Sequence, residues 1–100
     1  RSFAARSSSA ILEGSIAFGL SAALHEAVHI ADGQVQQTSL QDYPLLRLAE
    51  MPAVEVHILP SRRAPGGVGE PGVPVIAPAV GNAVFAASGQ RLRRLPLRLR

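Results

Sequence analysis

Residues 25–29 read HEAVH, the letter pattern of a zinc protease motif. In such a motif His25 and His29 would bind zinc from one helical face, and the glutamate between them would act on the metal-bound water. The β-branched Val28 and Ile30, followed closely by an Asp-Gly turn signal, instead favour a strand. Residues four apart on a strand lie roughly 13 Å apart, too far for one zinc ion. The pattern therefore favours two ordinary histidines, and a zinc metalloprotease is the less favoured alternative.

A second candidate is the stretch PGGVGEPGVP, residues 65–74, in which four glycines and three prolines surround one carboxylate, Glu70. Glycines let the backbone pass close to a bulky group, and prolines restrict the freedom of the loop. A single acid held in this way suits general acid–base chemistry. Composition alone also allows a rigid connector whose glutamate points to solvent. A loop that binds nucleotide phosphates is disfavoured, because the chain contains no lysine.

The composition limits the classes of protein to consider. Of the 100 residues, 47% are hydrophobic and 17% charged, which excludes a disordered composition. Only 4% are aromatic, so we expect an aliphatic core and marginal stability in isolation. The absence of cysteine excludes disulfides and iron–sulfur ligation by this chain. Five of the ten arginines lie in residues 91–100, where no aromatic residue is interleaved, so a solvated basic tail is favoured over a nucleic-acid surface.

The elements that must position these residues follow from hydrophobic spacing. Apolar residues recur at helical spacing over residues 12–24 and predict a buried helix, whose Gly14 and Gly19 allow another element to approach closely. The serine-rich residues 1–10 are predicted to be irregular. Residues 27–40 predict a β-hairpin with its turn at Asp-Gly.

The clearest strand pattern is AVEVHIL, residues 53–59, in which apolar and polar side chains alternate. A loop is predicted over residues 61–72, and a second helix from near Val75 to a stop at Gly89. Together these elements predict an α+β fold with two helices and a small, mostly antiparallel sheet.

The chain begins with Arg1, and no targeting segment follows it, which suggests a piece of a longer polypeptide. The longest mostly apolar stretch, residues 14–24, is too short to span a bilayer, so no membrane span is expected.

Three segments in order carry a resemblance to a known family. They are EGSIAFGLSAAL (13–24), ADGQVQQTSLQDYPLLRLAEMPAVEVHIL (31–59) and PGGVGEPGVPVIAPAVGNAVFAASGQRLRRLP (65–96). The combination resembles the C-terminal end of the molybdenum-binding large subunit of the xanthine dehydrogenase and aldehyde oxidase superfamily, in its isoquinoline 1-oxidoreductase and nicotinate dehydrogenase branch. Residues 11–97 are thus interpreted as the C-terminal part of a larger molybdopterin-binding domain, after an N-terminal segment (1–10) and before a basic tail (98–100).

The resemblance implies that Glu70 is the catalytic base of a hydroxylase that oxidises an N-heteroaromatic or aldehyde substrate with oxygen derived from water. The cofactor contacts that it implies are Gly14, Gly67, Val68 and Gly69. The expected cofactor is molybdopterin, in its molybdopterin cytosine dinucleotide form. The expected partners are the rest of the large subunit, an iron–sulfur small subunit that takes up the electrons, and a small-molecule substrate, with no nucleic acid.

The isolated 100-residue chain is expected to be inactive. A non-catalytic fragment or interaction module that keeps the family's shape is the competing interpretation. In relatives, the residues at EAVHI form a strand, usually without a pair of histidines, which makes HEAVH a coincidence. Ile11 stands where relatives generally carry a glutamine that lies against the pterin.

Overall fold

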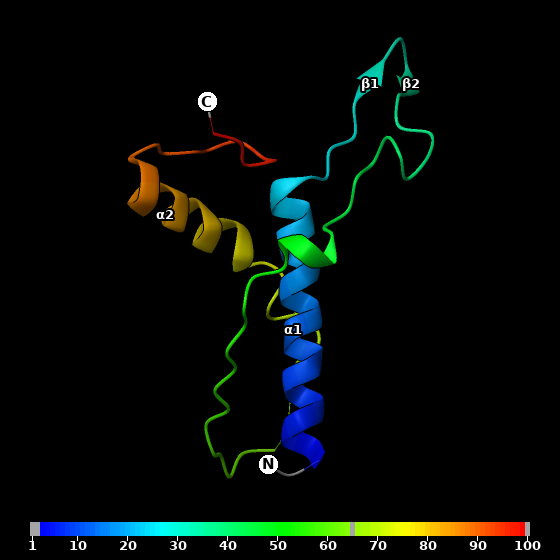
Figure 1. Ribbon diagram of the computed structural model, residues 1–100. Helices are drawn as coiled ribbons and strands as arrows, with labels where there is room; N and C mark the ends of the chain where they lie inside the picture. The colour runs from blue at the N-terminus through cyan, green and yellow to red at the C-terminus, as the bar shows by residue number, and fades with distance from the viewer. Residues whose placement is uncertain (1–2, 65, 100) are drawn as a thin grey trace.

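Two helices, a short hairpin and long connections make up the structure, a computed structural model that describes residues 3–64 and 66–99 (Figure 1). In chain order the elements are α1 (Phe3–Leu24), β1 (Ile30–Ala31), β2 (Gln34–Val35), the 3-10 helix η1 (Leu48–Glu50) and α2 (Ile76–Ser88). Two helices with a two-stranded antiparallel sheet agree with the predicted α+β class.

Helix α1 begins nine residues earlier than predicted, at Phe3 rather than at residue 12. The prediction of an irregular segment is therefore wrong for residues 3–10, whereas residues 1–2 lie outside the described part of the chain. No glycine or proline precedes Gly14. Serine lowers helix propensity by less than about 0.7 kcal/mol relative to alanine, so a serine-rich run continues a helix without a break.

Helix α1, being longer than predicted, also contains a longer apolar segment. Within α1, Arg6–Leu24 is long and apolar enough to cross a membrane by length and composition alone. The core helix of a soluble protein and an N-terminal signal sequence satisfy the same criteria, and a third of this segment is buried against the rest of the chain. Arg6–Leu24 is thus longer than the apolar stretch of residues 14–24 that the sequence indicated. Its length and composition alone do not show that it spans a membrane.

The predicted hairpin is confirmed, although its strands contain only two residues each. Ile30 lies opposite Val35, and the turn residues Asp32 and Gly33 have φ angles of 51° and 72°. Two successive left-handed residues are typical of the type I′ turn, whose twist matches that of an antiparallel pair. The Asp-Gly pair is therefore the local cause of this hairpin.

Helix α2 agrees with its predicted bounds. It ends where Gly89 adopts a left-handed conformation, with a φ angle of 73°, and donates its N–H to the carbonyl of Phe85 at 2.8 Å. Glycine is favoured at this position because a side chain would be strained there.

The strand predicted over residues 53–59 is absent from the described structure. A strand requires a neighbour for its N–H and C=O groups. No backbone group of residues 53–59 makes a hydrogen bond to another described residue. The described chain by itself does not form this strand, because the alternating pattern specifies which face is buried but supplies no pairing partner.

The few buried hydrophobic residues gather around the C-terminal half of α1. The exposed fractions of Leu20, Ala23 and Leu97 are 7%, 1% and 9%. The N–H of Leu97 donates to the carbonyl of Ala23 at 2.7 Å, so the C-terminal segment folds back over the end of α1 (Figure 1). The arginine run nevertheless remains exposed to solvent, as predicted for a basic tail, at all four of its described arginines, Arg91, Arg93, Arg94 and Arg98.

Candidate functional site

The turn before α2 packs directly against α1 at Gly19. A Cβ atom built on Gly19 would lie 2.8 Å from the carbonyl oxygen of Val73 and 3.1 Å from Cβ of Ile76. Only a glycine leaves room for this approach. The prediction that Gly19 allows another element to come close is confirmed, and the neighbouring element is the start of α2.

A second close approach lies one helical turn earlier. A Cβ atom on Gly72 would overlap the hydroxyl of Ser15 and lie 3.1 Å from its Cβ atom. Ser15 is 6% exposed, and its hydroxyl donates to the carbonyl of Leu12 at 2.8 Å. Gly72 and Gly19 together hold the turn at residues 69–75 on one face of α1.

This turn carries Glu70. The carbonyl of Glu70 accepts a hydrogen bond from the N–H of Val73 at 2.9 Å, which closes a β-turn. The side chain of Glu70 is exposed and lines a hollow of about 890 Å³. The walls of the hollow come from α1 and from the turn, as Gly14, Ser15, Phe18, Gly69, Pro71, Val73 and Pro74.

The structure brings together some of the residues that the sequence assigns to the site. Gly14, Gly69 and Glu70 line the same hollow, although Gly14 is far from the other two in sequence. Gly67 and Val68 are exposed and lie outside its lining. Pro65, the first residue of the glycine–proline stretch, lies outside the described residues.

Phe18 and Ser15 are lining residues that the sequence analysis did not single out. Phe18 is 67% exposed, which is unusual for an aromatic ring on a helix predicted to be buried. The sequence could have indicated Phe18 as a lining residue, because it lies four residues after Gly14 and residues i and i+4 share one helical face.

The hollow fits one side of a bound organic cofactor. At both Gly14 and Gly69, a Cβ atom would meet no other atom within 4 Å, so the backbone on both walls is accessible. Phe18 adds an exposed aromatic surface, and Glu70 adds the one carboxylate of the lining. Accessible backbone, an aromatic surface and a small number of polar groups are typical of sites for flat organic molecules.

A larger hollow, of about 1030 Å³, lies between residues 26–29 and the C-terminal segment. Four arginines line it, together with Glu26 and His29. It contains none of the residues that the resemblance assigns to catalysis or cofactor binding, so its size does not make it the candidate site.

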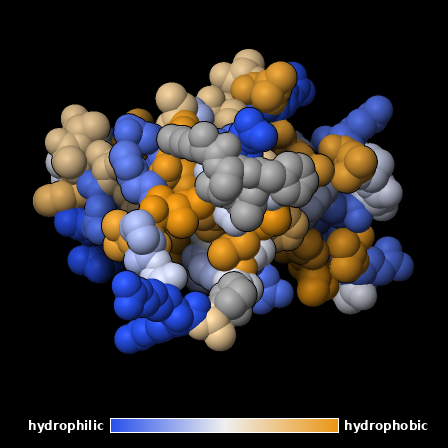
Figure 2. Space-filling view, turned by 90° about the horizontal axis from the view of Figure 1, so that it is seen from below, coloured by the Kyte–Doolittle hydropathy of each residue, from blue (hydrophilic) through white to orange (hydrophobic). Residues whose placement is uncertain are grey.

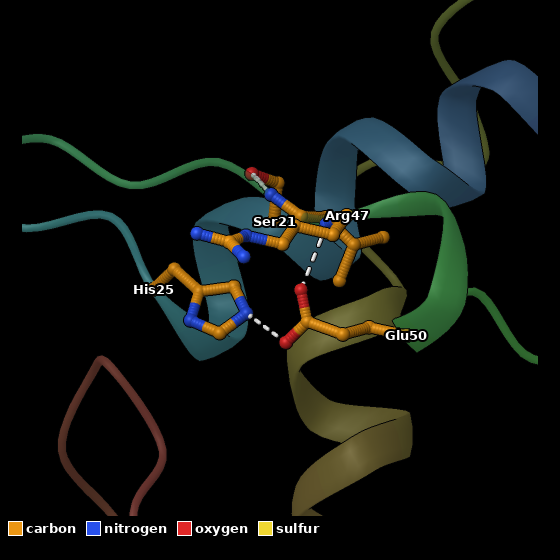
Figure 3. A network of polar contacts seen from close by, with 5 residues as sticks. Ser21, His25, Arg47 and Glu50 are labelled. Atoms are coloured by element: carbon orange, nitrogen blue, oxygen red, sulfur yellow. Dashed lines mark hydrogen bonds and ion pairs between the residues drawn. The ribbon is translucent and has the colours of Figure 1, made fainter. Parts of the chain in front are cut away.

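His25, the first residue of HEAVH, takes part in a polar network at the end of α1 (Figure 3). Nε2 of His25 lies 2.7 Å from Oε1 of Glu50, and Oε2 of Glu50 accepts the backbone N–H of Arg47 at 2.8 Å. The hydrogen bond from Arg47 lowers the pKa of Glu50 most, and the contact with His25 lowers it further. The hydroxyl of Ser21 accepts the N–H of Leu46 at 3.0 Å.

A serine, a histidine and a glutamate in this network raise the question of a nucleophilic triad. The hydroxyl of Ser21 is used by the backbone of Leu46, and no hydrogen bond joins it to His25 within the described part of the chain. Ser21 is 6% exposed. The network therefore attaches η1 to α1 and has a structural role.

The zinc protease alternative is wrong for a geometric reason. Helix α1 ends at Leu24, before the motif, and His29 lies in the extended segment that leads into β1. The N–H of His29 donates to Oε1 of Gln37 at 2.7 Å. The two histidines thus share no helical face, and the described residues contain no group of three side chains arranged to hold a metal ion.

Glu26, the glutamate of HEAVH, is also used structurally. Its Oε2 atom accepts a hydrogen bond from the hydroxyl of Tyr43 at 3.0 Å, and this bond raises the pKa of Tyr43. The contact ties the segment after α1 to the connection that precedes η1.

No family model matches the chain, but three curated proteins do. A membrane-bound aldehyde dehydrogenase (pyrroloquinoline-quinone) of Gluconacetobacter polyoxogenes is 44% identical over 86 residues, and the beta subunit of an isoquinoline 1-oxidoreductase from Brevundimonas diminuta is 43% identical over 87 residues. A subunit of nicotinate dehydrogenase from Pseudomonas putida is 34% identical over 87 residues. The matches cover 86%, 87% and 86% of this chain and 11%, 11% and 7% of the relatives.

All three relatives are oxidoreductases by name, and two are named as subunits. Their matches extend over the same segments that carry the resemblance in the sequence. Over these 86–87 residues the chain is similar to a segment of proteins whose names belong to the molybdenum hydroxylase family. It spans about a tenth or less of the length of the relatives that it matches.

Proposed function

We propose that this chain contributes the general base to the active site of a molybdenum hydroxylase that oxidises an N-heteroaromatic or aldehyde substrate. One observation carries the proposal: Glu70 shares a hollow with Gly69 and, from α1, with Gly14 and Phe18. The substrate range follows from the relatives, whose names include aldehyde, isoquinoline and nicotinate.

Each lining residue has a role in this proposal. The bound molybdopterin would supply the oxidation chemistry. The carboxylate of Glu70 would act as the general base that takes the proton from the water-derived oxygen that attacks the substrate. The accessible backbone at Gly14 and Gly69 would lie against the cofactor, and Gly67 and Val68 would extend this contact along the same loop.

The remaining walls of the site would come from the rest of the large subunit. We propose an iron–sulfur small subunit as the electron acceptor, and the names of two relatives as subunits support a partner subunit. We propose the cytosine dinucleotide form of molybdopterin as the cofactor. One relative is named with pyrroloquinoline quinone instead, and metal and nucleotide analysis of the purified enzyme distinguishes the two cofactors.

The test is Glu70→Gln in the complete subunit that carries this sequence. Glutamine keeps the shape of the side chain but cannot accept the proton, so kcat should fall by about 10²- to 10⁴-fold. Molybdenum content should stay unchanged, because the carboxylate is not proposed as a ligand. Glu55→Gln is the matched control, since Glu55 is an exposed carboxylate outside the hollow, and it should retain full activity.

Activity of the Glu70→Gln enzyme within threefold of the unchanged protein would contradict the proposal. It would favour the competing interpretation, in which this segment keeps the family's shape without a catalytic residue. Loss of molybdenum together with activity would assign Glu70 to cofactor retention instead of proton transfer.

A further inference from the structure

Residues 53–59 have the side-chain arrangement of a β-strand. Nε2 of His57 lies 2.9 Å from Oε1 of Glu55, and both side chains are largely exposed, at 75% and 82%. Val54 and Val56 are half-buried. Side chains two residues apart share a face only in an extended backbone, so one face of this segment is polar and the other apolar.

The backbone of the same segment has no partner. Within the described residues, none of the N–H or C=O groups of residues 53–59 takes part in a hydrogen bond. Pro52 and Pro60 flank the segment, and no proline or glycine interrupts it. A run of seven residues with free main-chain groups is a template for pairing with another strand, and proline is typical of the ends of such a strand.

The surface around the segment also lacks a neighbour. The accessible surface of the chain is 8044 Å², whereas a compact protein of this mass exposes about 5,400 Å². Ile58 and Leu59 are 49% and 84% exposed, and apolar side chains are spread across the face shown in Figure 2. The chain matches at most 11% of each relative, so most of the polypeptide of those relatives has no counterpart in it.

We propose that residues 53–59 form a β-strand that pairs through its main chain with a strand from the remaining sequence of the large subunit. The partner would satisfy the free N–H and C=O groups, with the Val54 and Val56 side of the new pair towards the core and the Glu55 and His57 side towards solvent. The proposal rests on the chain being part of a large subunit, and not on the role of Glu70.

Hydrogen exchange of the assembled enzyme tests the pairing. The peptide that covers residues 53–59 should exchange at least about 100-fold more slowly than its intrinsic rate, because paired amides exchange only on local opening. Exchange at the intrinsic rate would overturn the proposal. The Glu70→Gln enzyme should give the same protection, so a failure of the catalytic proposal leaves this result unchanged.

A photo-cross-linking amino acid at His57 identifies the partner. The position is exposed in this chain, and a directly opposite residue on a paired strand would lie about 5 Å away. Cross-linked peptides from the same large subunit are expected. A cross-link to the small subunit or to a second copy of the large subunit would overturn the assignment of the partner.

Discussion

At the scale of single residues, two histidine–glutamate pairs of similar length have different roles. His25 and Glu50 lie 2.7 Å apart and join the end of α1 to η1, whereas His57 and Glu55 lie 2.9 Å apart within one extended segment. Glu50 also accepts a backbone N–H, which makes it the centre of the network at the end of α1. A pair that joins distant segments resists their separation, whereas a pair within one segment does not.

Glu50→Gln should lower the thermal stability of the subunit at pH 7, and Glu55→Gln should leave it unchanged. The folded-state pKa of Glu50 lies below its ordinary value of 4.5. A depressed pKa contributes stability above the unfolded-state pKa, and this contribution is lost as the pH falls through the folded-state value. The Tm difference between the unchanged protein and Glu50→Gln should therefore shrink below pH 4.5. Equal Tm values at pH 7 would contradict the structural role of Glu50.

At the scale of elements, the position of Glu70 depends on two glycines that carry no chemistry. Gly19 lies against the carbonyl of Val73, and Gly72 lies over Ser15. These contacts hold the turn that carries the carboxylate beside α1. A side chain at either position would move the turn away from the helix, and Glu70 with it.

Gly19→Ala should lower the free energy of unfolding of the complete protein by about 1–3 kcal/mol, since overpacking forces backbone shifts. It should also lower kcat, because the turn with Glu70 must move. Gly81→Ala in α2 is the control: a Cβ atom there meets nothing within 4 Å, so the change should be neutral or stabilise α2 by up to about 1 kcal/mol. Urea unfolding and kcat measure both effects. Unchanged values for Gly19→Ala would show that the close approach is unimportant.

At the scale of the whole molecule, the chain is extended. Its radius of gyration is 16.6 Å and its extents are 54 × 34 × 26 Å, whereas a compact domain of 100 residues has a radius of gyration of about 13 Å. No large side chain in the described structure is fully buried. The arrangement therefore leaves α1 and the long connections with little buried apolar surface.

The 100-residue chain expressed alone should show no cooperative heat-capacity transition, because it buries too little apolar surface to offset its conformational entropy. A compact domain of this length unfolds with an enthalpy of about 60–80 kcal/mol. Differential scanning calorimetry measures this quantity directly. A single sharp transition with an enthalpy in that range would show that the chain folds by itself.

The sequence by itself determined the features that depend on residues close together along the chain. The Asp32-Gly33 turn and the end of α2 at Gly89 were predictable because each is a backbone conformation that glycine or Asp-Gly favours locally. The role of Glu70 stays a prediction, which rests on the motif in which this residue stands. The start of α1 was missed because a serine-rich run lacks the apolar period that indicates a helix.

Only the tertiary structure decided which distant residues meet. Gly14 and Phe18 line one hollow with Glu70, and His25 pairs with Glu50, because the turn and η1 pack on α1. The alternating pattern of residues 53–59 indicated a strand, but no other described segment pairs with it. The physical reason is common to these cases: helix ends and tight turns are closed by hydrogen bonds over a few residues, whereas strand pairing and site geometry require a surface from elsewhere in the polypeptide.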